Sequence, residues 1–133
     1  MLQLYGESLK HLSETERGCV LDYLEFLRER LAGNLIETRL FGSAARGDMW
    51  PSHFPMHSDI DVLIVTHERL TEEMREELVN ETYPLFLECG RQIGPQFRTL
   101  AEYESAKDER ARQFRANVEA EGLVLYKRSA LDK

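Results

Sequence analysis

The sequence lacks most of the features that mark secreted, membrane or metal-scaffold proteins. Its two cysteines, Cys19 and Cys89, form neither a disulfide framework nor a Cys-x-x-Cys or other metal-type spacing. No apolar run approaches the ~20 residues that span a bilayer, and the N-terminus has no basic-then-apolar signal pattern. We therefore expect two buried, reduced thiols in a cytoplasmic protein that has no membrane partner.

Positive charge is also scarce. Lysine and arginine number 17 against 24 aspartates and glutamates, which gives a formal net charge of −7. Direct nucleic-acid binding is not expected, because lysine and arginine contacts to phosphates normally supply most of that affinity. Such a surface suits a small anionic ligand only where positive groups cluster locally, and it suits a basic protein partner.

The composition indicates one ordinary globular domain, without repeats or low-complexity segments. Hydrophobic residues make up 42% of the chain and charged residues 31%, which places it in the usual range for such proteins. We place the domain at residues 1–126 and treat 127–133 as a short C-terminal tail. A chain of this length is expected to form one core and not two.

Apolar spacing and capping residues predict a small α/β (α+β) fold. Ser13 and Glu16 match a capping box that starts a first helix, and Gly33 is a plausible stop. The other elements expected are strands at 35–41 and 59–65, a helix from Thr71 that Pro84 should kink or break, a strand at 92–100, a helix at 102–121 and a strand at 123–126. Their order predicts a small mixed sheet with helices packed on one face.

The segment from Leu40 to Val65 carries the strongest chemical signal. Asp59 and Asp61 lie two residues apart in a strand-like apolar run, so both carboxylates should project from the same face. Two such hard oxygen ligands suit Mg²⁺. Gly42 and Ser43 follow their own strand and offer backbone N–H groups and a hydroxyl to phosphate. Together these groups indicate phosphoryl or nucleotidyl transfer.

Each part of this pattern also has a structural explanation. An Asp-x-Asp alone is most often a strand end with solvated carboxylates, and a Gly-Ser alone is an ordinary turn and helix cap. Arg46 either reaches a phosphate or pairs with an acidic residue of the fold. The histidines at 53, 57 and 67 do not form a metal set, and the charge run at 107–115 is expected to be a solvated helix face.

The combined motifs resemble the minimal nucleotidyltransferases (MNT) of the DNA polymerase beta-like superfamily. The matching segments are Phe-Gly-Ser-Ala-Ala-Arg-Gly at 41–47, Ser-Asp-Ile-Asp-Val-Leu-Ile-Val at 58–65 and Glu-Gly-Leu-Val-Leu-Tyr at 121–126. The resemblance implies a nucleotidyltransferase fold. It also implies catalytic and metal-binding roles for Asp59 and Asp61, with Mg²⁺ as cofactor. Nucleotide binding then falls to Gly42, Ser43, Arg46 and Ser58.

The chain departs from the family pattern at two places. The segment between Gly-Ser and Asp-x-Asp is expanded at 49–56, where Trp50 and Phe54 form either a local hydrophobic plug or an exposed contact surface. Active members also carry a third acidic residue on a later strand, and the alignment puts Gln96 there. An amide is a poor Mg²⁺ ligand and cannot act as a base, although an acid such as Glu104 is a candidate substitute.

The resemblance implies a Mg²⁺-dependent enzyme that moves AMP from ATP onto a hydroxyl. The chain is too short to carry its own acceptor domain, so another molecule is expected to complete the site. MNT proteins commonly act as antitoxins that add AMP to a tyrosine of a HEPN-domain toxin, and that partner is expected here. The alternative is a weakened MNT-fold module that neutralises a toxin by occlusion. A drug-modifying aminoglycoside nucleotidyltransferase is disfavoured, since it needs a second helical domain.

Overall fold

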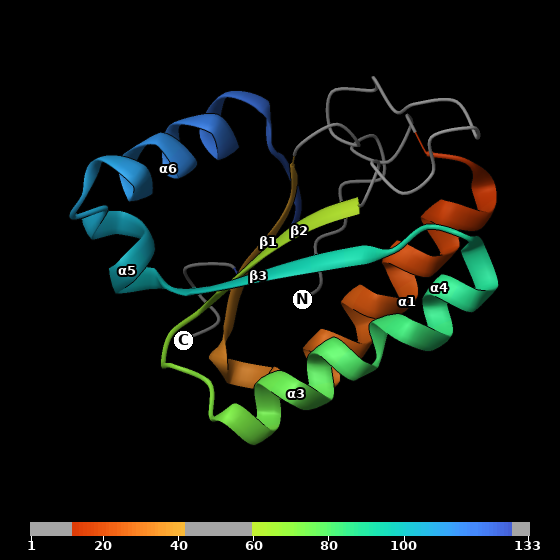
Figure 1. Cartoon of the computed structure of the whole chain (residues 1–133). Coiled ribbons are helices and arrows are strands. Elements are labelled where there is room, and N and C mark those ends of the chain that lie inside the picture. The colour runs from red at the N-terminus through yellow and green to blue at the C-terminus, as the bar shows by residue number, and fades with distance from the viewer. Residues whose placement is uncertain (1–11, 42–59, 129–133) are drawn as a thin grey trace.

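The computed structural model describes residues 12–41 and 60–128. A four-stranded sheet lies at the centre of the fold, with helices on both of its sides (Figure 1). In chain order the elements are α1 (Glu14–Leu31), the short 3₁₀ helix η2 (Ala32–Asn34), β1 (Leu35–Phe41), β2 (Ile60–Thr66), α3 (Glu72–Asn80), α4 (Thr82–Cys89), β3 (Ile93–Thr99), α5 (Leu100–Ser105), α6 (Glu109–Glu121) and β4 (Leu123–Lys127).

The strands lie in the order β3-β2-β1-β4. β1 pairs antiparallel with both β2 and β4, whereas β2 and β3 run parallel. A parallel pair needs a long crossover, and α3 and α4 supply it. The predicted mixed sheet is therefore confirmed, and β3 becomes one of its edges.

The first helix begins where the capping box predicts. The Ser13 hydroxyl accepts from the Glu16 N–H at 3.1 Å, and the Glu16 carboxylate accepts from the Ser13 N–H at 2.9 Å. Both bonds satisfy N–H groups that the helix itself leaves without partners. The helix buries apolar side chains at helical spacing: Val20, Leu24, Leu27 and Leu31.

The helices cover both faces of the sheet, which corrects the expectation of helices on one face. Ile60 and Ile64 point toward α1, α3 and α4, while Leu63 and Val65 pack under α5 and α6. All four side chains are buried, since β2 lies inside the sheet with both faces covered. The nearly continuous apolar sequence of β2 is typical of a strand that is buried on both faces.

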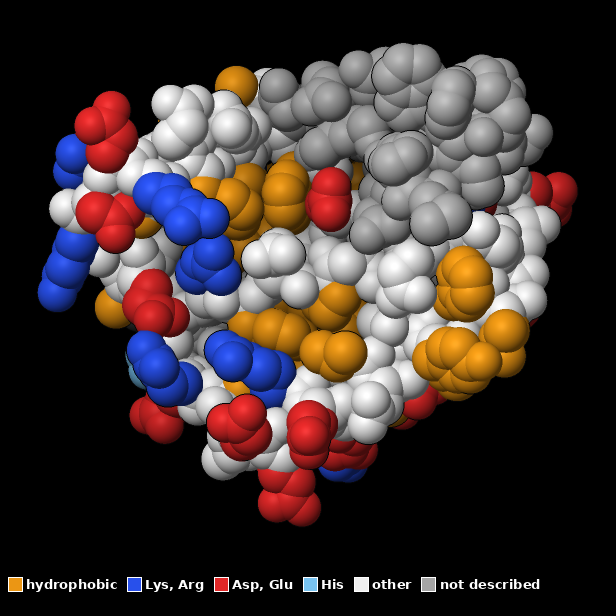
Figure 2. Space-filling view, viewed as in Figure 1, with side chains coloured by type: hydrophobic (Ala, Val, Ile, Leu, Met, Phe, Trp, Pro, Cys, Tyr) orange, Lys and Arg blue, Asp and Glu red, His pale blue; other side chains and the backbone are white. Residues whose placement is uncertain are grey.

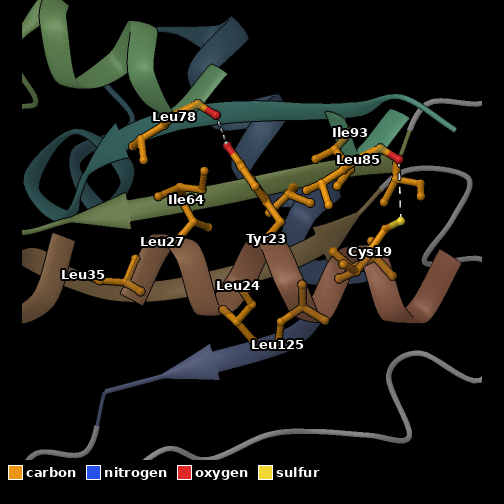
Figure 3. Close-up of a cluster of buried hydrophobic side chains, with 14 of the residues drawn as sticks. Cys19, Tyr23, Leu24, Leu27, Leu35, Ile64, Leu78, Leu85, Ile93 and Leu125 are labelled. Atoms are coloured by element: carbon orange, nitrogen blue, oxygen red, sulfur yellow. Dashed lines mark hydrogen bonds between the residues drawn. The ribbon is translucent and has the colours of Figure 1, made fainter. Parts of the chain in front are cut away.

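The larger core lies between the sheet and α1, α3 and α4. Figure 3 shows Tyr23 and Leu27 of α1 pointing at Ile64 and Leu78, with Leu125 of β4 on the far side of the helix. The Tyr23 hydroxyl donates to the Leu78 carbonyl at 2.8 Å, so its one polar atom is paired inside the core. This bond fixes α1 against the end of α3.

Two helical segments are interrupted, one as predicted and one not. The helix from Thr71 breaks at Glu81, and Pro84 then occupies the first turn of α4, where a missing N–H is tolerated. The single helix predicted at 102–121 is wrong. Ala106 adopts a left-handed conformation (φ 40°) and separates α5 from α6. Asp108 then caps α6 by accepting from the Ala111 N–H at 2.7 Å.

The two cysteines are free thiols. Cys19 is buried and donates to the Leu85 carbonyl at 3.6 Å, and Cys89 is half-buried. Burial raises the pKa of the Cys19 thiol to about 12, with further contributions from Cys89, Glu88 and Asp22. The Cys19 thiol is therefore protonated at neutral pH. Among the described helices, none is long and apolar enough to cross a membrane.

β4 ends at Lys127, one residue beyond the predicted boundary between domain and tail. The Arg128 N–H donates to the Ile36 carbonyl at 2.8 Å, and the Arg128 guanidinium donates to the Gly33 carbonyl. The division at residues 126 and 127 stays a prediction.

Two buried threonines provide a matched test of the core. Thr38 is fully buried, and its hydroxyl has no hydrogen-bond partner among the described residues. Thr38→Val should raise the free energy of unfolding by about 1 kcal/mol, because it removes a buried hydroxyl that is not bonded. Thr82 is also buried, but its hydroxyl donates to the Val79 carbonyl at 2.6 Å and accepts from Gln92 at 3.0 Å.

Thr82→Val should therefore lower the free energy of unfolding by about 1–2 kcal/mol. Urea denaturation of the two variants beside the wild type measures both effects. A loss of stability in both variants would show that the Thr38 hydroxyl is satisfied.

Candidate active site

Asp61 lies at the start of β2, where three strands meet. It pairs with Phe41 of β1 on one side and with Gly94 of β3 on the other. Because Asp61 shares a face with Leu63 and Val65, its carboxylate projects toward α5 and α6 and not into the larger core. The residue is half-buried.

A cavity of about 530 Å³ opens on this face. Asp61 and Gln96 both line it. Gln96 of β3 pairs with Leu63, which lies two residues after Asp61 on the same face of β2. The described residues that line the cavity are Phe41, Asp61, Gln96, Arg98, Glu102, Tyr103, Asp108, Arg110, Ala111 and Phe114. The sheet and the α5–α6 pair thus form a hollow with one sheet carboxylate and one amide at its base.

Aromatic rings and guanidinium groups form the other wall. The rings of Phe41 and Phe114 meet edge to face, with their centroids 5.5 Å apart. The Arg98 guanidinium lies 4.9 Å from the centroid of Phe114, a cation–π contact, and donates to the Phe97 carbonyl at 2.8 Å. Arg110 reaches the same cavity from α6. Figure 2 shows lysine and arginine side chains beside exposed hydrophobic atoms on this face.

A smaller hollow of about 200 Å³ shares Arg98 and Glu102 with the first cavity and adds Arg69 and Arg75. Arg75 lies over the ring of Phe97, with 5.8 Å between the guanidinium carbon and the centroid. Although the chain carries a net charge of −7, arginines cluster locally around the cavity. This clustering is the condition under which an acidic protein binds an anionic ligand.

Glu102 and Asp108 also line the cavity, and each has a structural role. Glu102 accepts from the Thr99 N–H at 2.9 Å and from Arg69 at 2.8 Å. The bond from the Thr99 N–H is the main cause that lowers the pKa of Glu102. Asp108 is occupied as the cap of α6. Among the residues that the structure describes, no three acidic, histidine or cysteine side chains form a metal-binding group.

Glu104 does not substitute for a third carboxylate in this cavity. It lies on α5 but lines a different hollow, with Ser105, Arg112 and Arg115. The Glu104 carbonyl accepts from Arg115 at 2.7 Å, and the residue is exposed. Glu104 follows Glu102 by two residues and Tyr103 by one, so its side chain emerges on a different side of α5 from these two cavity residues.

Tyr103 also lines the cavity, and its hydroxyl does not ionise readily. It donates to Glu119 at 3.2 Å. Burial is the main cause that raises the pKa of Tyr103, to about 12, and the negative charge of Glu119 adds to it. At neutral pH the group is a hydrogen-bond donor and not a base.

Most of the site residues predicted from sequence lie outside the described residues. They are Gly42, Ser43, Arg46, Ser58 and Asp59, together with the expanded loop at 49–56 and the histidines at 53 and 57. His67 is exposed. Of the predicted residues, the structure places Asp61 and Gln96 in one cavity, and β1 ends at Phe41, just before Gly42.

Sequence reasoning missed the aromatic and basic wall. Arg110 belongs to the charge run that was expected to be solvated, and it is exposed while lining the cavity. Arg98 had a usable signal, because it lies two residues from Gln96 and both side chains therefore emerge on the same side of β3.

The chain belongs to the nucleotidyltransferase domain family, whose model matches residues 21–120. It is similar to the spectinomycin 9-adenylyltransferase of Enterococcus faecalis, with 35% identity over 66 residues. That match covers 50% of this chain and 24% of the relative, so the chain spans about a quarter of the length of the curated protein that it matches.

Solved structures agree with this assignment. The crystal structure of the Enterococcus faecalis spectinomycin adenyltransferase AAD(9) with ATP and spectinomycin is 28% identical, with a TM-score of 0.54. The match covers 65% of this chain and 35% of that one. A toxin–antitoxin complex with AMP-PNP is 19% identical, with a TM-score of 0.52, covering 86% of this chain and 76% of that one. The expected nucleotidyltransferase fold is confirmed.

Proposed function

We propose that this protein is a Mg²⁺-dependent adenylyltransferase that moves AMP from ATP onto a tyrosine hydroxyl of a HEPN-type toxin, and so acts as its antitoxin. The observation that carries the proposal is that Asp61 lines one cavity together with two arginines, Arg98 of β3 and Arg110 of α6. A carboxylate suits a divalent cation, and guanidinium groups suit phosphate oxygens. We assign this reaction to the cytoplasm, as expected from the sequence.

The proposed metal site combines Asp61 with Asp59. Asp61 supplies a half-buried carboxylate on the cavity face, and strand alternation would direct Asp59 to the same face. Bound Mg²⁺ would neutralise charge on the triphosphate and at the α-phosphorus. Gly42, Ser43, Arg46 and Ser58 are proposed to bind the nucleotide.

In the proposed reaction the acceptor hydroxyl oxygen attacks the α-phosphorus of ATP. The new oxygen–phosphorus bond forms as the bond from the α-phosphorus to the bridging oxygen breaks, and pyrophosphate leaves. The hydroxyl proton passes to water. Gln96 lines the same cavity as Asp61 but is uncharged and cannot take this proton, so we propose that transfer is slow while nucleotide binding is intact.

The toxin as acceptor is supported by the fold shared with the toxin–antitoxin complex and by the acidic surface, which suits a basic partner. A second acceptor is favoured by a separate observation. The chain is 35% identical over 66 residues to a spectinomycin adenylyltransferase, so a small-molecule hydroxyl has to be tested beside the protein.

Labelled ATP distinguishes these functions. The protein is incubated with Mg²⁺ and ATP labelled on either the α- or the γ-phosphate, together with the HEPN-domain protein encoded beside it or with spectinomycin. We expect the toxin to gain α-label and no γ-label. Transfer to spectinomycin alone would replace the proposed acceptor, and γ-label on the toxin would indicate phosphoryl transfer. Toxin inhibition without any label would favour neutralisation by occlusion.

A further inference from the structure

Helix α4 carries large apolar side chains on both of its sides. Thr82 and Leu85 face the core, while Tyr83, Phe86 and Leu87 face outward. The outward residues are 61%, 37% and 65% exposed. A helix that is apolar all round is normally buried on all sides. The exposed side of α4 therefore has the apolar composition of a surface that another protein segment or molecule normally covers.

These side chains form one patch with Val79 of α3, which is 42% exposed. We call Val79, Tyr83, Phe86 and Leu87 the α3–α4 patch. The four positions follow the spacing i, i+4, i+7 and i+8 that aligns side chains on one helix face. Glu81, which separates the two helices, has helical dihedrals (φ −67°, ψ −18°), and all four side chains of the patch are exposed. Figure 2 shows hydrophobic atoms gathered over α4.

The patch has an acidic rim. Between residues 72 and 90 there are six glutamates and one arginine, Arg75, whose guanidinium lies over Phe97. Glu76 and Glu88 are exposed, and Glu81 is half-buried. Glu77 is paired with Arg30 at 2.6 Å.

The patch lies near the same end of the sheet as Asp61. α4 ends at Cys89, and three residues later the Gln92 carbonyl accepts from the Ile60 N–H at 2.8 Å. Ile60 immediately precedes Asp61 in β2. β3, the edge strand, is the only strand of the described sheet that separates this end of α4 from β2. A molecule bound on α4 can therefore extend over β3 toward the cavity.

We propose that the α3–α4 patch is the docking surface for a protein partner that presents an apolar ridge flanked by lysine and arginine. The acidic rim is complementary to such a partner and repels a second copy of the same rim, which disfavours self-association. The identity of the partner as the HEPN-type toxin rests on the proposed function; the surface and its chemistry rest on the patch itself.

The test uses Tyr83→Ser/Leu87→Ser and a matched control, Leu21→Ser. Leu21 is 38% exposed on α1. It lies two residues from both Cys19 and Tyr23, whose side chains bond to α4 and α3, so it faces away from them. The HEPN-domain protein is titrated against each variant by calorimetry. We expect the double variant to bind at least about tenfold more weakly and the control to match the wild type. Wild-type association should weaken as salt rises.

Two further measurements keep this result separate from the proposed function. Binding of ATP with Mg²⁺ should be unchanged in the double variant, which confirms that it is folded, and light scattering should show the chain alone as a monomer. A dimer that dissociates in the double variant would overturn the proposal in favour of a second copy. Unchanged toxin binding by the double variant would overturn it even if AMP is transferred. Patch-dependent binding without AMP transfer would overturn the proposed function alone.

Discussion

Asp61→Asn is expected to reduce AMP transfer by at least about 10³-fold. Asparagine preserves the shape of the side chain but removes the charge that would hold Mg²⁺ at the base of the cavity. A catalytic metal ion is worth several kcal/mol of transition-state stabilisation, and each ~1.4 kcal/mol is a factor of ten in rate. The same variant, like Asp59→Asn, should lose ATP binding in calorimetry with Mg²⁺, and the wild type should lose it in EDTA.

The control for this prediction is Asp108→Asn. Asp108 lines the same cavity but caps α6, and asparagine is an equally good cap. The rate of AMP transfer by this variant should stay within a few-fold of the wild-type rate. Equal ATP binding by the wild type, Asp61→Asn and the EDTA-treated protein would show that the metal site is wrongly assigned.

Gln96→Asp is expected to accelerate transfer by about 10²–10⁴-fold, the usual contribution of a general base. Gln96 is exposed, lies on β3 beside β2 and lines the cavity that contains Asp61, so an aspartate there would place a second described carboxylate at the cavity base. ATP binding should change little, because the Asp59–Asp61 pair would still hold the metal that accompanies the triphosphate. Single-turnover rates measure the effect.

Gln96→Asn is the matched control, since it shortens the side chain equally without adding charge. It should not accelerate transfer. Rapid transfer by the wild type, together with an unchanged rate in Gln96→Asp, would show that Gln96 does not occupy the position of the missing acid.

Local patterns were sufficient to predict much of the fold. The Ser13–Glu16 capping box and the alternation in the strand that contains Asp61 depend on neighbours only a few residues away, and the structure confirms the helix start and this strand. The face of Asp61 followed from the same alternation. Such patterns are encoded within a single element, so a sequence shows them directly.

The distribution of the helices could not be predicted in this way. The break at Ala106 lies in a stretch whose composition suits a helix throughout, and only the cap at Asp108 marks the second start. The break lets α5 and α6 fold back over Leu63 and Val65. That packing brings Arg98, Arg110 and Phe114 together from different elements, and no local spacing relates them. The roles of Asp59 and of the Gly42–Ser43 turn stay predictions.

The intact mass of the HEPN-domain partner tests the central claim most directly. The partner is purified after incubation with this protein, ATP and Mg²⁺, and its mass is compared with that of a sample incubated with Asp61→Asn. We predict a gain of one or more AMP groups on a tyrosine of the partner in the first sample and none in the second. An unmodified partner in a mixture where the wild type binds ATP and Mg²⁺ would contradict the assignment of this protein as an AMP-transferring antitoxin.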